Sequence, residues 1–285
     1  MKIVRFLGGL GNQMFQYAFY KALQKRFPNV KADLQGFHDY GLHNGFELED
    51  LFDIRVSRAS LFKSKLYQVH HKKWIYRKLR RVLNLKKAYQ EEINLFGFDP
   101  EVFTNPKPAY YWGYWQNLAY FQDISKEIRA DFTFSNLSDS KNQGALNSIQ
   151  NSSSVSIHIR RGDYLTDPLL GGVCNLEYYQ KAISYVQSRV DSPKYFIFSN
   201  DIEWCRENLN LTNCEFISWN NGTKSYLDMQ LMSNCKHNII ANSSFSWWAA
   251  WLNQNNNNIV ICPKKWVNNP KLDTSGLLPK GWITI

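Results

Sequence analysis

The sequence lacks any long hydrophobic run. A membrane-spanning helix needs about 18 consecutive apolar residues, and no stretch approaches that length. The N-terminal residues 1–7 are partly apolar, but glycines follow at once, which is too early for the apolar core of a signal peptide. With 44% hydrophobic residues, the chain can still form a substantial core. These features lead us to expect a globular protein of the cytoplasm.

Cysteine is also scarce. The five cysteines are odd in number and form no Cys-x-x-Cys pair, so they suggest neither a disulfide framework nor a structural zinc site: they are Cys174, Cys205, Cys214, Cys235 and Cys262. His38 and His43, which flank Asp39 in a polar loop (36–45), lack a third ligand at suitable spacing. We therefore predict reduced core cysteines and no metal site.

Acidic residues are absent from one segment. Residues 58–87 contain eleven Lys or Arg and no Asp or Glu, which accounts for the formal net charge of +10. Within this segment, Ile75, Leu79, Val82 and Leu83 recur at helical spacing, while most of the basic residues around them (Lys73, Arg77, Arg80 and Arg81) fall on the other side. The pattern predicts a basic amphipathic helix.

Two interpretations of this helix stay open. It either packs on the domain with a solvated basic side, or it attaches to anionic lipid headgroups or to an anionic acceptor. No recognised nucleic-acid-binding motif accompanies it, so we expect no nucleic-acid partner.

The N-terminus reads as a strand (2–7), a glycine loop (8–13) and a helix (14–27). Met14 stands where a dinucleotide fingerprint needs its third glycine, and no Lys-Ser or Lys-Thr completes a P-loop. NAD binding and P-loop ATP hydrolysis are therefore excluded, while Asn12 and Gln13 offer amide donors and acceptors in the loop.

The C-terminal half alternates strands and helices, which predicts a doubly wound parallel sheet. The expected strands are 155–160, 194–199, 214–218, 238–241 and 258–262, and the expected helices are 176–190, 201–209, 224–234 and 244–254. A Ser- and Asn-rich stretch, residues 134–154, is predicted to connect the halves. We therefore expect two domains, 1–140 and 150–285.

Polar clusters follow three of these strands, at 160–163, 199–201 and 242–246, and are expected to converge on one crevice. Paired arginines, Arg160 and Arg161, suit a diphosphate, although a salt-bridged turn would show the same pattern. Ser243 and Ser244 either cap the following helix, bind an oxyanion, or do both.

Five aromatic rings crowd residues 110–116, ahead of a predicted helix at 118–131. Such rings either fill a core strand or stack on carbohydrate, and the sequence does not separate these roles.

Three motifs together resemble the bacterial α-1,2-fucosyltransferases of glycosyltransferase family 11: residues 8–16 (GGLGNQMFQ), 158–164 (HIRRGDY) and 242–250 (NSSFSWWAA). The resemblance implies a GT-B architecture, with two Rossmann-like domains facing a cleft. Residues 1–140, with the basic helical insertion, would form the acceptor side, and residues 150–285 would bind GDP-fucose. The implied reaction transfers L-fucose to the 2-hydroxyl of a terminal galactoside, with inversion and without an obligatory metal or other cofactor.

The resemblance also implies roles for the residues of the last two motifs. Arg160 would neutralise the β-phosphate, and Arg161 would either assist it or serve a structural purpose. His158 would lie against the guanine or ribose. The donor loop would hold the diphosphate through hydroxyl and backbone N–H groups, and comprises Asn242, Ser243, Ser244 and Phe245.

Two further roles are carried over at single positions. Asp228 matches the acidic residue that reads the guanine N1 and N2 donors, although a surface charge on a helix is the plain alternative. Asn12, beside Gln13, would sit across the cleft near the fucose or the acceptor.

The general base is less well defined. Asp163 is the first candidate, because it stands closest to the arginines, but it could only orient Arg160 or Arg161. Asp167 and Asp39 are alternatives, and a highly dissociative reaction could proceed with a weak base or water.

The expected role is surface-glycan assembly, of O-antigen or capsule, on the cytoplasmic membrane face. The acceptor class includes lipid-linked galactosides, and the segment 58–87 would make peripheral contact with the anionic membrane. Competing hypotheses are a fucosyltransferase of different linkage and a non-catalytic carbohydrate- or nucleotide-binding protein.

Overall fold

The computed structural model describes residues 1–37 and 44–285. The chain forms two compact units: Met1–Thr133 with Leu272–Leu278, and Phe134–Lys271 with Pro279–Ile285. Asp39, His38 and His43 lie outside the described residues, as do the metal-ligand and base hypotheses made for them. In the part of the chain that is described, no helix has the length and apolar content to cross a bilayer.

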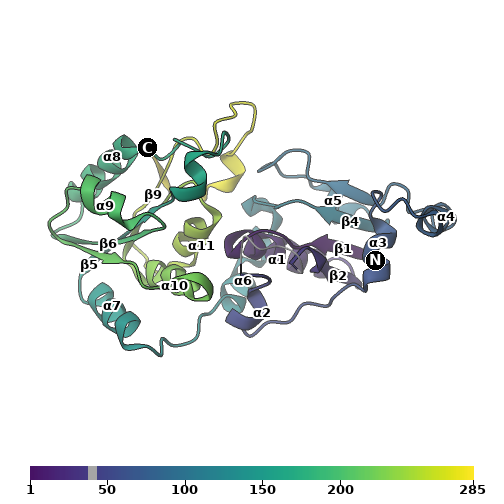
Figure 1. Ribbon diagram of the computed structural model, residues 1–285, viewed down its shortest axis with the longest axis horizontal. Coiled ribbons are helices and arrows are strands. Elements are labelled where there is room, and N and C mark those ends of the chain that lie inside the picture. The colour runs from purple at the N-terminus through teal and green to yellow at the C-terminus, as the bar shows by residue number, and fades with distance from the viewer. Residues whose placement is uncertain (38–43) are drawn as a thin grey trace. The chain divides into compact units, whose positions relative to one another are not determined.

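The first unit is built on a four-stranded parallel sheet with the order β2-β1-β4-β3, of which β1, β2 and β4 are labelled in Figure 1. Its strands are β1 (Lys2–Arg5), β2 (Val30–Asp33), β3 (Tyr89–Glu91) and β4 (Ala109–Trp112). Ile3 and Val4 of the central strand are fully buried, which explains why so short an apolar stretch forms a strand.

The glycine loop leads into α1 (Leu10–Gln24), which starts four residues earlier than predicted. Twelve of its fifteen residues are buried, so the helix is enclosed by its unit rather than lying on the surface. Outside residues 118–131, the remaining helical elements described in this unit are short: η1 (Gln35–Phe37), α2 (Leu48–Leu51), α3 (Leu61–Tyr67), α4 (Trp74–Val82), α5 (Glu101–Thr104) and η6 (Ser275–Leu277).

The predicted helix at 118–131 is wrong in its first half. The stretch divides into η2 (Leu118–Tyr120), η3 (Gln122–Ile124) and α6 (Ser125–Asp131). The Asn117 side chain accepts a hydrogen bond from the Ala119 N–H at 2.9 Å, and Phe121 then adopts φ −138°. Because that φ is not helical, a continuous helix cannot form.

Three of the aromatic residues in 110–116 belong to the core, which answers part of the question that the sequence left open. Tyr110, Tyr111 and Trp115 are at most 3% exposed. The Trp115 ring stacks on Phe19 with centroids 4.3 Å apart. Trp112 and Tyr114 are only half-buried.

The second unit contains a six-stranded parallel sheet with the order β10-β9-β8-β5-β6-β7, which confirms the predicted α/β class. The strands are β5 (Ser153–Ile159), β6 (Pro193–Ser199), β7 (Cys214–Ile217), β8 (His237–Ile239), β9 (Val260–Cys262) and β10 (Ile283–Thr284). Alternate residues of β5, Val155, Ile157 and Ile159, share one core cluster with α8 (Leu176–Gln187) and α9 (Ile202–Asn208).

The other face of this sheet carries α7 (Ser140–Gln150) and α10 (Tyr226–Asn234), as Figure 1 shows, and α11 (Ser244–Leu252) packs beside α10. The interpretation of 134–154 as a mere connection is wrong, because α7 occupies most of it. Asp139 caps this helix by accepting the Asn142 N–H at 2.9 Å, and Ala145 and Ile149 are buried.

Candidate active site

Three loops meet at the carboxyl edge of the six-stranded sheet. β5 pairs directly with β6 on one side and with β8 on the other, so the segments that follow these strands emerge side by side. The Arg161 N–H donates to Asn200 Oδ1 at 2.9 Å, and the Tyr164 hydroxyl donates to the Asn242 carbonyl at 3.4 Å. The polar clusters that the sequence predicted to converge are therefore in contact.

A close approach explains the glycine in the first loop. Gly162 has φ +37°, and a Cβ at this position would clash with the Asn200 Nδ2. Any other residue here would adopt a strained backbone conformation and would displace the Asn200 side chain, which accepts the Arg161 N–H.

Arg160 lies at the end of β5 with its guanidinium one-third exposed. Its Nη2 pairs with Asp163 Oδ1 at 2.8 Å, and the guanidinium lies 5.4 Å from the centre of the Tyr164 ring. Because the Asp163 side chain is 62% exposed, this ion pair is weakly held. Arg160 can thus turn toward an incoming anion at little cost.

Arg161 is held quite differently. Its Nε pairs with Asp201 Oδ2 at 2.9 Å, and its guanidinium stacks 4.1 Å above the Trp204 ring. Asp201 also caps α9 by accepting the Trp204 N–H. This geometry matches the structural alternative for Arg161, because the side chain joins the loop after β5 to the start of α9.

His158 is buried within β5, and its ring lies 5.7 Å from that of Phe245. Burial, and next the positive charge of Arg160, lower the pKa of His158 to about 3, so the imidazole is neutral. Its Nδ1 has no hydrogen-bond partner among residues 1–37 and 44–285. A neutral ring can pack against a base or sugar without adding charge.

The segment before α11 contains two polar side chains, Asn242 and Ser243, that hydrogen-bond to neighbouring loops, and it leads into the first turn of the helix. Asn242 Nδ2 donates to the carbonyls of Leu170 and Trp266, so this side chain ties two loops together. The Ser243 side chain hydrogen-bonds with Tyr164 and, within the described structure, does not cap α11, so the capping alternative is wrong for Ser243. α11 begins at Ser244, and the backbone N–H groups of a first helical turn, here those of Ser244 and Phe245, point toward the side from which an anion can approach.

Asp228 on α10 ends a chain of side-chain amides. Its Oδ1 accepts a hydrogen bond from Asn220 Nδ2 at 2.8 Å, and Asn220 exchanges two hydrogen bonds with Asn142. Burial raises the pKa of the Asp228 carboxyl to about 7, against the opposing effect of Asn220. Asp228 is therefore not an ordinary surface charge. Asn142 and Asn220 were not predicted from the sequence, although the Asp139-x-x-Asn142 spacing is a capping signal.

Asp167 closes a turn, since its Oδ1 accepts the N–H groups of Leu169 and Leu170 at 2.7 and 2.9 Å. Such a carboxylate is partly satisfied by its own loop, which makes Asp167 a weaker candidate base than Asp163.

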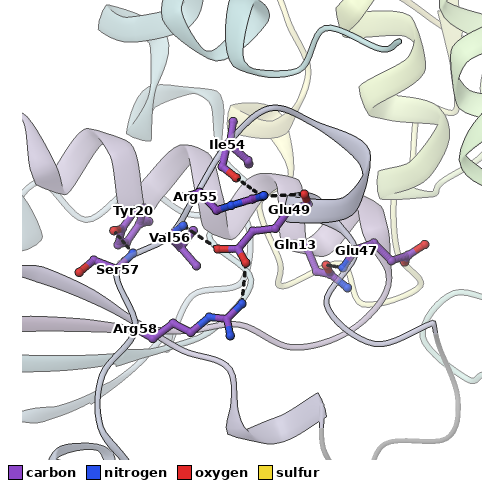
Figure 2. Close-up of polar contacts among 9 residues, drawn as sticks. All are labelled: Gln13, Tyr20, Glu47, Glu49, Ile54, Arg55, Val56, Ser57 and Arg58. Carbon is purple, nitrogen blue, oxygen red and sulfur yellow. Dashed lines mark hydrogen bonds and ion pairs between the residues drawn. The ribbon is translucent and has the colours of Figure 1, made fainter. Parts of the chain in front are cut away.

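In the first unit, the amide side chains of Asn12 and Gln13, predicted to lie in the glycine loop, belong instead to the first turn of α1 and are held in different ways. Asn12 Oδ1 accepts a hydrogen bond from Gln116 Nε2 at 2.8 Å. Gln13 donates to the carbonyls of Gly8 and Gly45 and accepts the Glu47 N–H at 2.9 Å, a contact drawn in Figure 2. Both Gln13 donors thus serve the local fold.

Glu92 is a buried carboxylate that the sequence analysis missed. It follows β3, and its Oε2 accepts the N–H groups of Tyr114 and Trp115 at 2.7 and 3.1 Å. Burial raises its pKa. Together with Trp115 and Tyr120, Glu92 lines a cavity of about 160 Å³. No periodic pattern marks this position, because β3 is only three residues long.

Comparison with known proteins covers the whole chain. The family described as Glycosyl transferase family 11 matches residues 1–285. An α-1,2-colitosyltransferase from Escherichia coli is 34% identical, over 99% of this chain and 98% of its own. WbnK, an O-antigen biosynthesis glycosyltransferase from Escherichia coli, is 33% identical over 98% of each chain. A galactoside α-(1,2)-fucosyltransferase 2 from Rattus norvegicus is 26% identical over 88% of this chain and 67% of its own.

Among solved structures, the fucosyltransferase NodZ from Bradyrhizobium matches with a TM-score of 0.50 and 11% identity, over 87% of this chain and 91% of its own. A likeness at such low identity concerns the fold. The GT-B type of fold implied by the sequence motifs is confirmed in this sense.

Proposed function

Because the chain belongs to glycosyltransferase family 11, we propose that it transfers L-fucose from GDP-fucose to the 2-hydroxyl of a terminal galactoside. The observation that carries this proposal is the geometry of Arg160. Arg160 directly follows β5, and its guanidinium is partly exposed. The neighbouring strand β8 is followed by the loop that leads into α11, so a diphosphate bound here could contact both the arginine and the N–H groups of the helix.

In the proposed reaction, the acceptor oxygen attacks C1 of fucose opposite the departing GDP. The bond between C1 and the β-phosphate oxygen breaks, and its electron pair leaves with GDP. Negative charge therefore grows on the β-phosphate in the transition state, where Arg160 and the N–H groups of Ser244 and Phe245 would stabilise it. No metal is required by this scheme, and metal independence stays a prediction.

The guanosine part of the donor would be held by Asp228 and His158. An ionised carboxylate accepts two parallel hydrogen bonds, which matches the N1–H and N2–H donors of guanine. The buried network that includes Asn220 keeps the Asp228 side chain in one position. His158, neutral and beside Phe245, offers a flat surface for the ribose or base.

Asp163 is the proposed acceptor of the proton from the galactoside hydroxyl. Its exposure and its single ion pair, to Arg160, leave one carboxylate oxygen available. If the reaction is highly dissociative, Asp163 would instead serve mainly to orient Arg160.

Asn12 is proposed to contribute to the binding of fucose or acceptor, held by its hydrogen bond to Gln116. The relatives support a galactoside acceptor and a role in O-antigen or similar glycan assembly, since their names include both terms. A lipid-linked galactoside falls within this acceptor class.

A second candidate concerns the donor sugar. The relative that is 34% identical is named an α-1,2-colitosyltransferase, and colitose is fucose without its 3-hydroxyl group. The same site could therefore use GDP-activated colitose. A pocket that hydrogen-bonds the 3-hydroxyl should reject colitose strongly, whereas one that merely encloses it should not.

The test is to supply GDP-fucose, GDP-colitose and other nucleotide sugars with lactose in the presence of EDTA, and to determine the linkage of any product. Fucosyl-lactose carrying fucose on the galactose 2-hydroxyl is the expected product. Preferred turnover of GDP-colitose would establish the second candidate instead. Arg160→Ala should lower kcat by about 100-fold or more, and Arg189→Ala, which removes a surface arginine stacked on Tyr185, is the matched control. Absence of both turnover and GDP-fucose binding would refute the proposal.

A further inference from the structure

The basic segment 58–87 also carries most of the exposed large apolar side chains. Among the described residues ten such side chains are at least 38% exposed, and seven of them fall in this one segment. The seven are Leu61, Phe62, Val69, Trp74, Ile75, Val82 and Leu83. A solvated helix that merely packs on its domain would not leave so much apolar surface in water.

One side of α4 is fixed to the unit. Leu79 and Tyr76 pack against a buried cluster that includes Leu66 of α3. Arg80, expected on the solvent side, is instead 5% exposed and donates to four backbone carbonyls, those of Lys65, Leu66, Gln68 and His71. Arg80 therefore binds the turn between α3 and α4 and holds α4 in one orientation.

The opposite side of α4 is exposed. Trp74, Ile75, Lys78, Arg81 and Val82 occupy positions i, i+1, i+4, i+7 and i+8, which lie on one flank of a helix. Trp74 is 70% exposed and Val82 72% exposed, and the Lys78 ammonium lies 6.0 Å from the Trp74 ring. We call these five residues the α4 flank.

The charge around this flank is not neutralised within the described structure. Of the eleven basic residues in 58–87, Arg58 is the one that forms an ion pair there, with Glu49, as Figure 2 shows. Arg77, Arg81, Lys72, Lys73 and Lys78 are exposed around α4. The α4 flank thus combines a row of exposed apolar side chains with surrounding positively charged side chains.

We propose that the α4 flank docks the protein on an anionic lipid bilayer. The apolar side chains of Trp74, Ile75 and Val82 enter the headgroup region, and Lys78 and Arg81 pair with lipid phosphates. A tryptophan at such a position suits the interface between water and lipid. This proposal goes beyond the proposed function, since it requires no turnover.

Other occupants fit the flank less well. A second copy of the chain would bring two clusters of eleven positive charges together, and these would repel each other. A free anionic glycan would pair with the lysines and arginines but would leave the apolar stripe in water.

The experiment is flotation of the full chain with vesicles of phosphatidylcholine alone or with about 30 mol% phosphatidylglycerol, in about 0.1 M salt. We expect binding to the anionic vesicles, little binding to the neutral ones, and weakening at about 0.5 M salt. Lys78→Glu with Arg81→Glu should reduce the partition coefficient at least about tenfold. Trp74→Ser with Val82→Ser should also reduce it about tenfold.

Matched controls separate docking from general attraction. Lys265→Glu with Lys271→Glu makes the same change in net charge on exposed residues of the other unit, and Ile93→Ser removes an apolar side chain that is 97% exposed. Both should bind as the unmodified chain does, and all variants should keep its melting temperature.

Three results would overturn the proposal. The first is failure of the full chain to float with anionic vesicles. The second is an equal loss of binding in the control pair, which would mean that net charge alone attracts the protein. The third is concentration-dependent self-association without lipid that Trp74→Ser with Val82→Ser abolishes, which would assign the flank to a second copy.

Discussion

The Asp228 carboxylate accepts a hydrogen bond from the Asn220 side chain at 2.8 Å, and burial still raises its pKa to about 7. One donor is thus insufficient to offset the loss of water around the charge. A guanine base that supplies two further donors would complete the set. The ligand-free site is therefore poised between its charged and neutral forms near neutral pH.

A pH dependence of nucleotide binding follows. The ionised Asp228 carboxylate is the form that accepts from guanine, so GDP affinity should fall up to about tenfold for each pH unit below about 7. Calorimetric titration of GDP between about pH 5.5 and pH 8 measures this. The terminal phosphate of GDP also titrates at about pH 6, so Asp228→Asn is the control. This variant should bind GDP more weakly, and its GDP affinity should change less with pH. An identical slope in both proteins would contradict the assignment.

The same residue should limit stability. The folded state raises the pKa of Asp228 above its ordinary value of 3.8, so the folded chain holds that proton more tightly than the unfolded chain does. The free energy of unfolding therefore falls as pH rises from about 4 to about 7 and stays low above that. Asp228→Asn should raise the melting temperature at pH 8 by about 2–6 °C and have less effect at pH 5. A lower melting temperature at pH 8 would show that the carboxylate stabilises the fold.

The two adjacent arginines should respond oppositely to removal. Arg160→Ala should lower kcat by about 100-fold or more with little change in melting temperature, because its exposed ion pair to Asp163 contributes little to stability. Arg161→Ala should lower the free energy of unfolding by about 1–2 kcal/mol, since it loses both Asp201 and the Trp204 stack. Kinetics and urea unfolding of both variants test this. A larger kinetic defect in Arg161→Ala would reverse the assignment.

Removal of Trp115 and removal of Trp112 should affect stability and acceptor KM differently. Trp115 is 3% exposed and stacks on Phe19, so Trp115→Ala should cost about 3–5 kcal/mol of stability and harm donor and acceptor KM together. Trp112 is half-buried, and if it contacts the acceptor, Trp112→Ala should raise acceptor KM alone. Urea unfolding and separate KM measurements distinguish the two. Unchanged stability in Trp115→Ala would contradict its core role.

The alternation of strands and helices in residues 155–262 was predictable because each element carries its own periodicity. The β-branched run at Val155, Ile157 and Ile159 signals a buried strand, and parallel strands joined by helices place their carboxyl ends at one edge. Arg160, at the end of such a strand, could therefore be placed at this edge of the sheet from its position alone, and its role in a site stays a prediction.

Elements without periodicity were missed or misjudged. β3 spans three residues and gives no usable pattern. The helix α7 was hidden by polar residues, although its Asp139 cap and the buried Ala145 and Ile149 position it. Asn117 broke a predicted helix through a side-chain hydrogen bond that composition does not reveal.

The sequence by itself determined the parallel α/β sheet of residues 155–262, the family motifs and the basic character of residues 58–87, because these depend on local residue pattern and on formal charge. Only the tertiary structure decided how residues of the same type are held. Arg161 is paired with Asp201 and stacked on Trp204, whereas Arg160 has one exposed ion pair, and Arg80 is buried while Lys78 and Arg81 are exposed. The physical reason is that burial and hydrogen-bond partners come from segments distant in sequence, and these set both the pKa of Asp228 and the freedom of each cation.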